Sequence, residues 1–170
     1  WTNYKKDPIF QLVFAQPAML EDFEINQVKA LINSGASREE VANMVSDIRS
    51  KKNPAPANQS YNRPTLEEDD GEVLDGLQHK YKKIALMFHK NAQTCHAYCS
   101  YCFRFNQFVG KDTFLEDDSS RMLKYLAKHT EITDLLVTGG DPATMKSFVW
   151  EDMLLPLLGP QYDHIRSIRV

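Results

Sequence analysis

Three cysteines are the residues in this sequence whose type and spacing most clearly indicate chemistry. Cys95, Cys99 and Cys102 lie within one eight-residue segment, and the chain has no other cysteine. An odd number of cysteines this close together does not form a disulfide framework and indicates a reducing compartment and a bound metal. Three thiolates on one short loop suit an iron–sulfur cluster. Zinc is the alternative, and it would need a fourth ligand, for which His89 and His96 are candidates.

A cluster held by only three thiolates has a chemical consequence. In a cubane cluster, one iron is then left without a protein ligand. An iron in that position can bind a substrate or a cofactor, as the open position of a catalytic zinc does. The cysteine spacing therefore predicts a reactive site.

A second group of candidate residues follows a short apolar run at 135–137. Thr138, Gly139, Gly140 and Asp141 are consecutive and precede Pro142. Two adjacent glycines let the backbone approach a ligand closely, and their N–H and C=O groups can pair with it. The aspartate could form a charge-assisted hydrogen bond to such a ligand. The alternatives are that the glycines form only a turn and that Asp141 caps the segment after it.

Alternating apolar runs and helical patterns predict the elements that position these two groups. Because strands and helices alternate, we expect an α/β fold with a parallel sheet and right-handed crossovers. Ligands bind at the carboxyl ends of such strands, where both groups of residues fall. The expected elements are a strand at 84–88, a helix at 116–128, a strand at 135–137, a helix at 150–158 and a strand at 165–170.

The N-terminal part reads as helical. One helix is expected around residues 24–32, and Ser37 with Glu40 predicts a capping box for the next. Proline-rich and acidic stretches interrupt the pattern afterwards. We therefore expect a helical region at 1–50, a linker or surface excursion at 51–75, and an α/β region at 76–170.

The cysteine segment resembles the C-x3-C-x-aromatic-C signature of radical S-adenosylmethionine (SAM) enzymes, with Tyr101 as the aromatic residue. This resemblance implies a 4Fe–4S cluster on Cys95, Cys99 and Cys102. It also implies a partial (β/α) barrel, of which 76–170 would form the first β/α units, and reductive cleavage of SAM to a 5′-deoxyadenosyl radical. The glycine segment resembles the motif that holds the SAM amino group, so residues 138–141 are expected to bind SAM. Tyr101 would lie where the chain passes the adenine of SAM, or it would only pack against neighbouring residues.

Two further segments narrow the resemblance. Residues 76–81 read Gly-Leu-Gln-His-Lys-Tyr, and residues 102–104 read Cys-Phe-Arg. Both are similar to segments of the lysine 2,3-aminomutase family. That resemblance implies pyridoxal phosphate (PLP), bound through a lysine beyond Val170, and migration of an amino group on lysine or a related amino acid. The substrate could also be a lysine side chain of a protein. A flavodoxin or ferredoxin as reductant, a cytoplasmic location and a homo-oligomer are further expectations.

Composition excludes other classes of function. The net charge is −3, so no basic surface for nucleic acid is expected. No apolar run approaches the roughly 20 residues of a membrane helix. The chain starts at Trp1 and ends at Val170 within an expected strand, which predicts a piece of a longer protein. Two alternatives remain open: a radical SAM enzyme without PLP, and a zinc-binding interaction module.

Overall fold

The structure is a computed structural model in which the chain divides into two compact units. One unit comprises Trp1–Pro56 and His96–Lys111, and the other comprises Ala57–Cys95 and Asp112–Val170. The domain boundaries expected from the sequence stay predictions. The structure describes residues 3–16, 19–52, 61–66, 71–97, 99, 102, 104, 116 and 118–170.

The described part of the first unit is mainly helical, as expected for residues 1–50. Its elements are the 3₁₀ turn η1 (Tyr4–Lys6) and the helices α1 (Pro8–Val13), α2 (Asp22–Asn33) and α3 (Arg38–Lys52).

The capping box predicted for α3 is confirmed. The Glu40 amide donates to the Ser37 hydroxyl oxygen at 3.2 Å, and the Ser37 amide donates to the Glu40 carboxylate at 2.7 Å. These two bonds satisfy backbone donors that the first turn of a helix otherwise leaves unpaired. The sequence pattern therefore predicted the start of α3 correctly.

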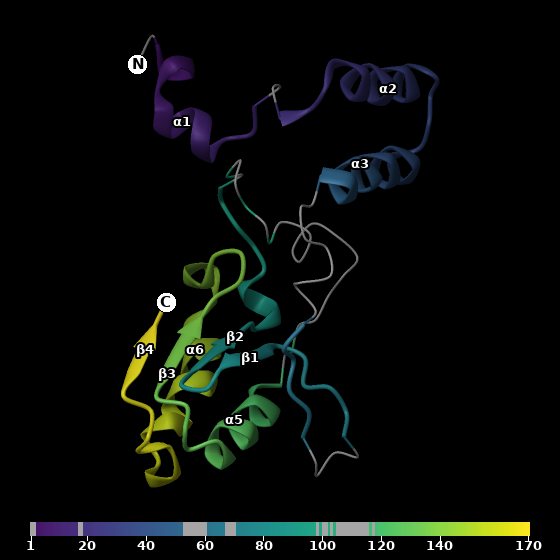
Figure 1. The fold of residues 1–170 in the computed structure, drawn as a ribbon. Helices are drawn as coiled ribbons and strands as arrows, with labels where there is room; N and C mark the ends of the chain where they lie inside the picture. Colours follow the sequence, from purple (N-terminus) through teal and green to yellow (C-terminus); the bar gives the residue numbers. More distant parts are fainter. Residues whose placement is uncertain are drawn as a thin grey trace. The chain divides into compact units, whose positions relative to one another are not determined.

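The second unit contains a four-stranded sheet in the order β1-β2-β3-β4 (Figure 1). The three strands expected from apolar runs are confirmed, and β2, β3 and β4 pair in parallel. A fourth strand, β1, pairs antiparallel with β2 and was not predicted. The bounds are β1 (Leu77–Tyr81), β2 (Ile84–Met87), β3 (Asp134–Val137) and β4 (Ser167–Arg169).

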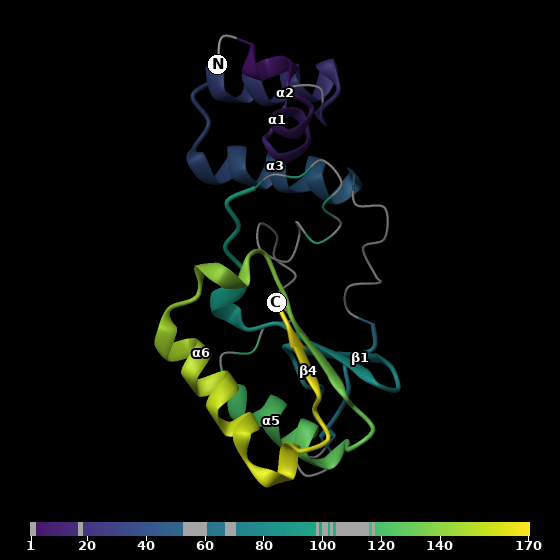
Figure 2. The same ribbon diagram turned by 90° about the vertical axis from the view of Figure 1, so that its left-hand side faces the viewer.

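Two helices join the parallel strands, and Figure 2 shows both on the same face of the sheet. Helix α5 (Ser119–Lys128) connects β2 to β3, and α6 (Ser147–Leu154) connects β3 to β4. This is the arrangement that right-handed crossovers produce. The fold is thus mixed α/β, while the closure of such units into a barrel stays a prediction.

The bounds of both helices differ from expectation, for identifiable reasons. The expected start of α5 at Glu116 was wrong, because the Asp118 carboxylate accepts from the Ser120 amide and so caps a helix that begins at Ser119. The chain after α6 tightens into the 3₁₀ turn η7 (Leu155–Leu158). Pro156 lacks the amide that a continuing helix needs.

The core lies between the sheet and the two helices. Helix α5 presents one apolar face, including Met122 and Leu126, which are fully buried. Leu66 and Leu74, from the segment before the sheet, are buried in the same cluster. The other fully buried apolar residues of this cluster are Leu77, Ala85, Met87, Ala92, Ile132, Leu135, Val137 and Met153.

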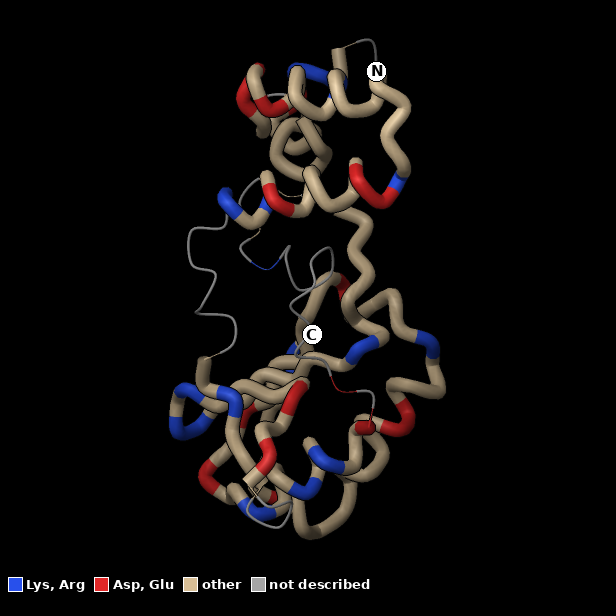
Figure 3. Tube along the Cα trace, turned by 90° about the vertical axis from the view of Figure 1, so that its right-hand side faces the viewer, with Lys and Arg blue, Asp and Glu red and all other residues tan. Residues whose placement is uncertain are grey.

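The charged residues are mixed over both units. Figure 3 shows acidic and basic positions interspersed along the described chain. Among the described helices, none combines the length and the apolar character that crossing a membrane requires.

Candidate functional site

The cysteine segment leaves the sheet at the carboxyl end of β2, as the sequence predicted. The chain passes through Phe88 and His89 into the 3₁₀ turn η5 (Lys90–Ala92) and reaches Cys95 three residues later. Residues 92–94 are called the cysteine stem from here on. Cys95 belongs to the sheet unit, whereas Cys99 and Cys102 belong to the helical unit. The three-thiolate site therefore stays a prediction from the sequence.

The chemistry of the three cysteines themselves suits metal binding. All three are free thiols of intermediate exposure. The Cys102 amide donates to the Cys99 carbonyl at 3.0 Å, which links the second and third cysteines. Of the two histidines considered as zinc ligands, His96 is exposed and His89 is buried.

The base of the loop that carries the cysteines is closed by backbone pairing. His89 and Glu116 form an isolated parallel bridge, and the Lys90 amide donates to the Glu116 carbonyl at 2.9 Å. Gly76 lies beside both strands of this closure, since its carbonyl accepts from the Phe88 amide at 2.7 Å and a Cβ on it would lie 2.5 Å from the Glu116 Cβ. The residues where the loop leaves and rejoins the sheet unit are therefore held together.

The structure brings the glycine segment directly onto the cysteine stem. The Gly140 amide donates to the Ala92 carbonyl at 2.8 Å. The Asp141 amide donates to the Thr94 carbonyl at 2.8 Å and to the Ala92 carbonyl at 3.2 Å. Two motifs separated by more than forty positions in the sequence are thus joined at the carboxyl ends of β2 and β3.

The two glycines are required by this contact. A Cβ atom on Gly139 would lie 2.7 Å from the Ala92 carbonyl oxygen, and one on Gly140 would lie 2.8 Å from the Thr94 carbonyl oxygen. Gly139 also has a φ of 154°, which side chains rarely adopt. The position that a Cβ would occupy on each glycine therefore faces the cysteine stem.

The carbonyl groups of the glycine segment do not take part in this contact. The carbonyl oxygens of Thr138, Gly139 and Gly140 accept no hydrogen bond from any residue that the structure describes. The Asp141 carboxylate accepts from the Ala143 amide at 3.0 Å and caps the short turn η6 (Pro142–Thr144). The capping role considered for Asp141 is confirmed, and a role in binding SAM stays a prediction.

Gln93 is a buried polar residue next to this junction that the sequence did not single out. Its side-chain nitrogen donates to the His89 carbonyl at 3.1 Å, which orients the amide. Its side-chain oxygen is buried and has no hydrogen-bond partner among the residues that the structure describes. A buried acceptor without a hydrogen bond lowers the free energy of unfolding by about 1–3 kcal/mol.

Tyr101, the aromatic residue of the cysteine signature, lies outside the described residues. Arg104, two residues after the third cysteine, is partly buried. Burial lowers the pKa of its guanidinium, and the neighbouring Cys102 thiolate opposes that shift.

A cluster of ionisable side chains at the amino ends of the parallel strands was not predicted. The Tyr125 hydroxyl lies 2.8 Å from His79 Nδ1, and the His129 ring stacks on Tyr125. The Glu131 carboxylate lies 2.8 Å from His129 Nδ1. Burial, with a contribution from the charge of Glu131, raises the pKa of Tyr125 to about 12.

This cluster has the composition of a metal site, but its atoms pair with one another. His79, His129 and Glu131 could offer three ligands. However, His79 Nε2 lies 3.2 Å from the Lys82 carbonyl, so both of its ring nitrogens have partners. The cluster therefore fastens the turn between β1 and β2 to the end of α5. His79 belongs to the motif at 76–81, which was the only signal for it in the sequence.

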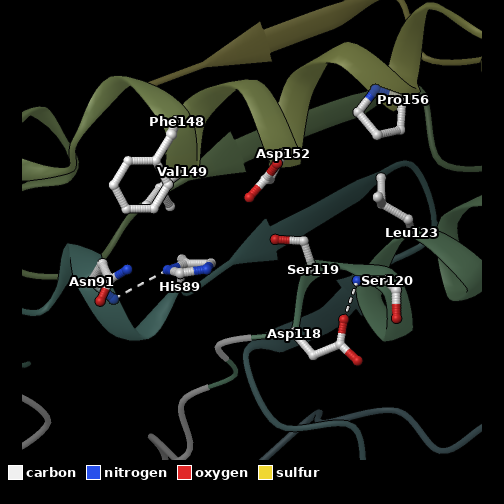
Figure 4. A pocket seen from close by; sticks show the side chains of 10 residues that line it. All are labelled: His89, Asn91, Asp118, Ser119, Ser120, Leu123, Phe148, Val149, Asp152 and Pro156. Atoms are coloured by element: carbon white, nitrogen blue, oxygen red, sulfur yellow. Dashed lines mark hydrogen bonds between the residues drawn. The ribbon is translucent and has the colours of Figure 1, made fainter.

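One surface pocket lies beside the residues that follow β2, at the N-terminal ends of α5 and α6 (Figure 4). Its volume is about 380 Å³. Two acceptors that line the pocket already have hydrogen bonds. His89 Nδ1 accepts from the Asn91 backbone amide, and the Asp118 carboxylate accepts from the Ser120 backbone amide. The pocket is separate from the glycine segment, because neither glycine lines it.

Comparisons with known proteins agree on one family. The chain is 36% identical over 97 residues to a putative L-lysine 2,3-aminomutase of Aquifex aeolicus, a match that covers 57% of this chain and 25% of the relative. It is 30% identical over 103 residues to the L-lysine 2,3-aminomutase of Escherichia coli, covering 61% and 29%. The corresponding protein of Fusobacterium nucleatum is 28% identical over 107 residues, covering 62% and 24%.

These matches cover a limited part of each relative. The chain spans between about a quarter and three tenths of the length of the curated relatives it matches. No protein-family model matches the chain.

Proposed function

Because this chain is related in sequence to the lysine 2,3-aminomutases, we propose that it carries the cluster-binding and SAM-binding part of a radical SAM enzyme. The reaction proposed for the whole protein is migration of an amino group between neighbouring carbons of lysine or a related amino acid. The observation that carries this proposal is the direct docking of the glycine segment on the cysteine stem at the carboxyl ends of β2 and β3.

The donor set supports a cluster on Cys95, Cys99 and Cys102. Three free thiols on one loop suit iron, and no fourth cysteine exists in the chain to complete a tetrahedral zinc site of thiolates. A 4Fe–4S cluster bound there would supply one electron for cleavage of SAM. The chain's contribution is to hold the loop closed at its base, through the pairing of His89 with Glu116.

The glycine segment supports a site for the SAM amino group. Three consecutive carbonyl oxygens, of Thr138, Gly139 and Gly140, have no donor within the described chain. An ammonium group carries three donors and no acceptor, so it matches such a set of acceptors. The Asp141 carboxylate, adjacent in sequence, would add charge complementarity.

The aminomutase chemistry is proposed from the relatives' names. PLP would activate the substrate amino group, and the lysine that binds it is proposed to lie outside residues 1–170. The substrate would be a free amino acid or a lysine side chain of a protein, and a flavodoxin or ferredoxin would supply the electron.

The test uses protein expressed from the complete coding sequence, purified without oxygen and reduced with dithionite. With SAM and lysine we expect a rearranged lysine isomer, whose formation returns the abstracted hydrogen from 5′-deoxyadenosine to the product, with only a little 5′-deoxyadenosine and methionine released by uncoupled cleavage. We also expect PLP absorbance that borohydride fixes to a lysine. Cleavage of SAM without bound PLP would overturn the aminomutase assignment and favour a radical SAM enzyme of another kind. Absence of SAM cleavage from cluster-loaded protein would overturn the whole proposal.

A further inference from the structure

The glycine segment carries two sets of backbone polar groups, and only one of them is used by the proposed SAM site. The carbonyl oxygens of residues 138–140 are the set proposed for SAM. The amide groups of Gly140 and Asp141 are the other set, and both donate to the cysteine stem. These amides cannot bind SAM while they are engaged in this way.

The stem that receives these bonds ends one residue before the first cysteine. Thr94, whose carbonyl accepts from the Asp141 amide at 2.8 Å, is covalently followed by Cys95. Ala92 accepts twice, at 2.8 Å from Gly140 and at 3.2 Å from Asp141. The backbone immediately before Cys95 is therefore anchored at two carbonyl groups to the end of β3.

Close packing reinforces the hydrogen bonds. A Cβ on Gly140 would lie 2.8 Å from the Thr94 carbonyl oxygen and 2.9 Å from the Thr94 carbonyl carbon. Both atoms belong to the backbone, so they cannot turn aside as the end of a flexible side chain would. Any side chain at position 140 must therefore push the backbone that leads into Cys95.

Metal sites are sensitive to displacements of this size. Metal–thiolate distances are held within about 0.2 Å in functional sites. A Cβ on Gly140 would lie 2.8 Å from a backbone oxygen, and ordinary van der Waals contact begins at 3.4 Å, so the backbone must shift by about 0.6 Å. The required backbone shift is thus larger than the tolerance of a metal–thiolate distance.

We infer that Gly140 and Asp141 are positioning residues for Cys95: their amides and the bare face of Gly140 fix the backbone that presents the first cluster ligand. This inference rests on the proposed function, because it assigns Cys95 to the cluster. It goes beyond SAM binding, since it predicts an effect on the cluster when no SAM is present.

The first test uses the wild-type protein and hydrogen exchange, which needs neither a cluster nor SAM. The amides of Gly140 and Asp141 should be protected to the same degree as amides of β2 and β3. Exchange as fast as that of an exposed turn would overturn the inference and remove the docking contact that supports the proposed function, whereas the iron and sulfide content of the protein would still test the cluster directly.

The second test compares Gly140→Ala with the control Gly159→Ala, where the three atoms nearest to the added Cβ all belong to the flexible side chain of Gln161. Both variants are reconstituted with iron and sulfide and measured without SAM. We expect Gly140→Ala to retain less than half of the wild-type iron, or to give a shifted electron paramagnetic resonance spectrum, while Gly159→Ala matches wild type.

Two other outcomes have distinct meanings. Wild-type iron content and an unchanged spectrum in Gly140→Ala would overturn the positioning role, even if SAM binding were weaker. Wild-type protein that holds no iron would overturn the proposed function, and the hydrogen-exchange result would still decide whether the amides anchor the stem. If Gly140→Ala does not fold, as judged by circular dichroism, that same exchange measurement decides the inference.

Discussion

Replacing Gly76 with Ala should destabilise the sheet unit at the base of the cysteine loop. Gly76 has a φ of 78°, and a Cβ there would lie 2.5 Å from the Glu116 Cβ and 3.0 Å from the Phe88 carbonyl oxygen. Alanine in this backbone conformation costs about 1–2 kcal/mol, and overpacking a closed site costs about 1–3 kcal/mol more. The expected loss of unfolding free energy is therefore about 2–5 kcal/mol.

Gly71 provides a matched control in the same unit. Its φ of 75° is nearly the same, but a Cβ there would have nothing within 4 Å. Gly71→Ala should lose only the conformational part, about 1–2 kcal/mol. The assay is urea unfolding followed by the fluorescence of Trp150, which packs against the core of this unit. Equal losses of unfolding free energy in the two variants would show that the clash with Glu116 and Phe88 contributes nothing, contrary to this prediction.

Three smaller predictions concern helix capping, the core and pH. Ser37→Ala removes the side-chain cap of α3 and should lower stability by about 1 kcal/mol in denaturant unfolding. Leu126→Ala empties a fully buried position and should cost about 2–5 kcal/mol, whereas Leu158→Ala, at an 82% exposed position, should change unfolding free energy little. Burial and the charge of Glu131 raise the pKa of Tyr125 from its ordinary 10.0 to about 12. The unfolding free energy should therefore fall as the pH rises from 10 towards 12, because the unfolded chain loses the Tyr125 proton first. Denaturant unfolding measured across this pH range should show no such fall in Tyr125→Phe.

The parallel part of the sheet was predictable because its strands are apolar runs. Strands β2 and β3 are short stretches of aliphatic residues separated by a helical pattern, which is typical of a sheet covered by helices. Strand β1 was missed for the opposite reason. It contains Gln78, His79 and Lys80, only its first residues are buried, and its turn to β2 has no glycine, asparagine or proline.

The two motifs of the site could be identified from residue types, but their contact could not. Spacing located Cys95 and Gly140, and strand order placed both at one edge of the sheet. That the Gly140 and Asp141 amides donate to the cysteine stem depends on the exact path of the chain after β2, through η5. The cluster around Tyr125 was equally hidden, since His79 and His129 are distant in sequence and meet only because α5 folds back on the sheet.

The central claim, that the cysteines hold an iron–sulfur cluster, is tested most directly by metal analysis. Protein expressed from the complete coding sequence is purified without oxygen, and iron, acid-labile sulfide and zinc are measured per chain, with Cys99→Ala as the control. We expect about four irons and four sulfides per wild-type chain and a large loss of both in the variant. Stoichiometric zinc with no sulfide in the wild-type protein would contradict it.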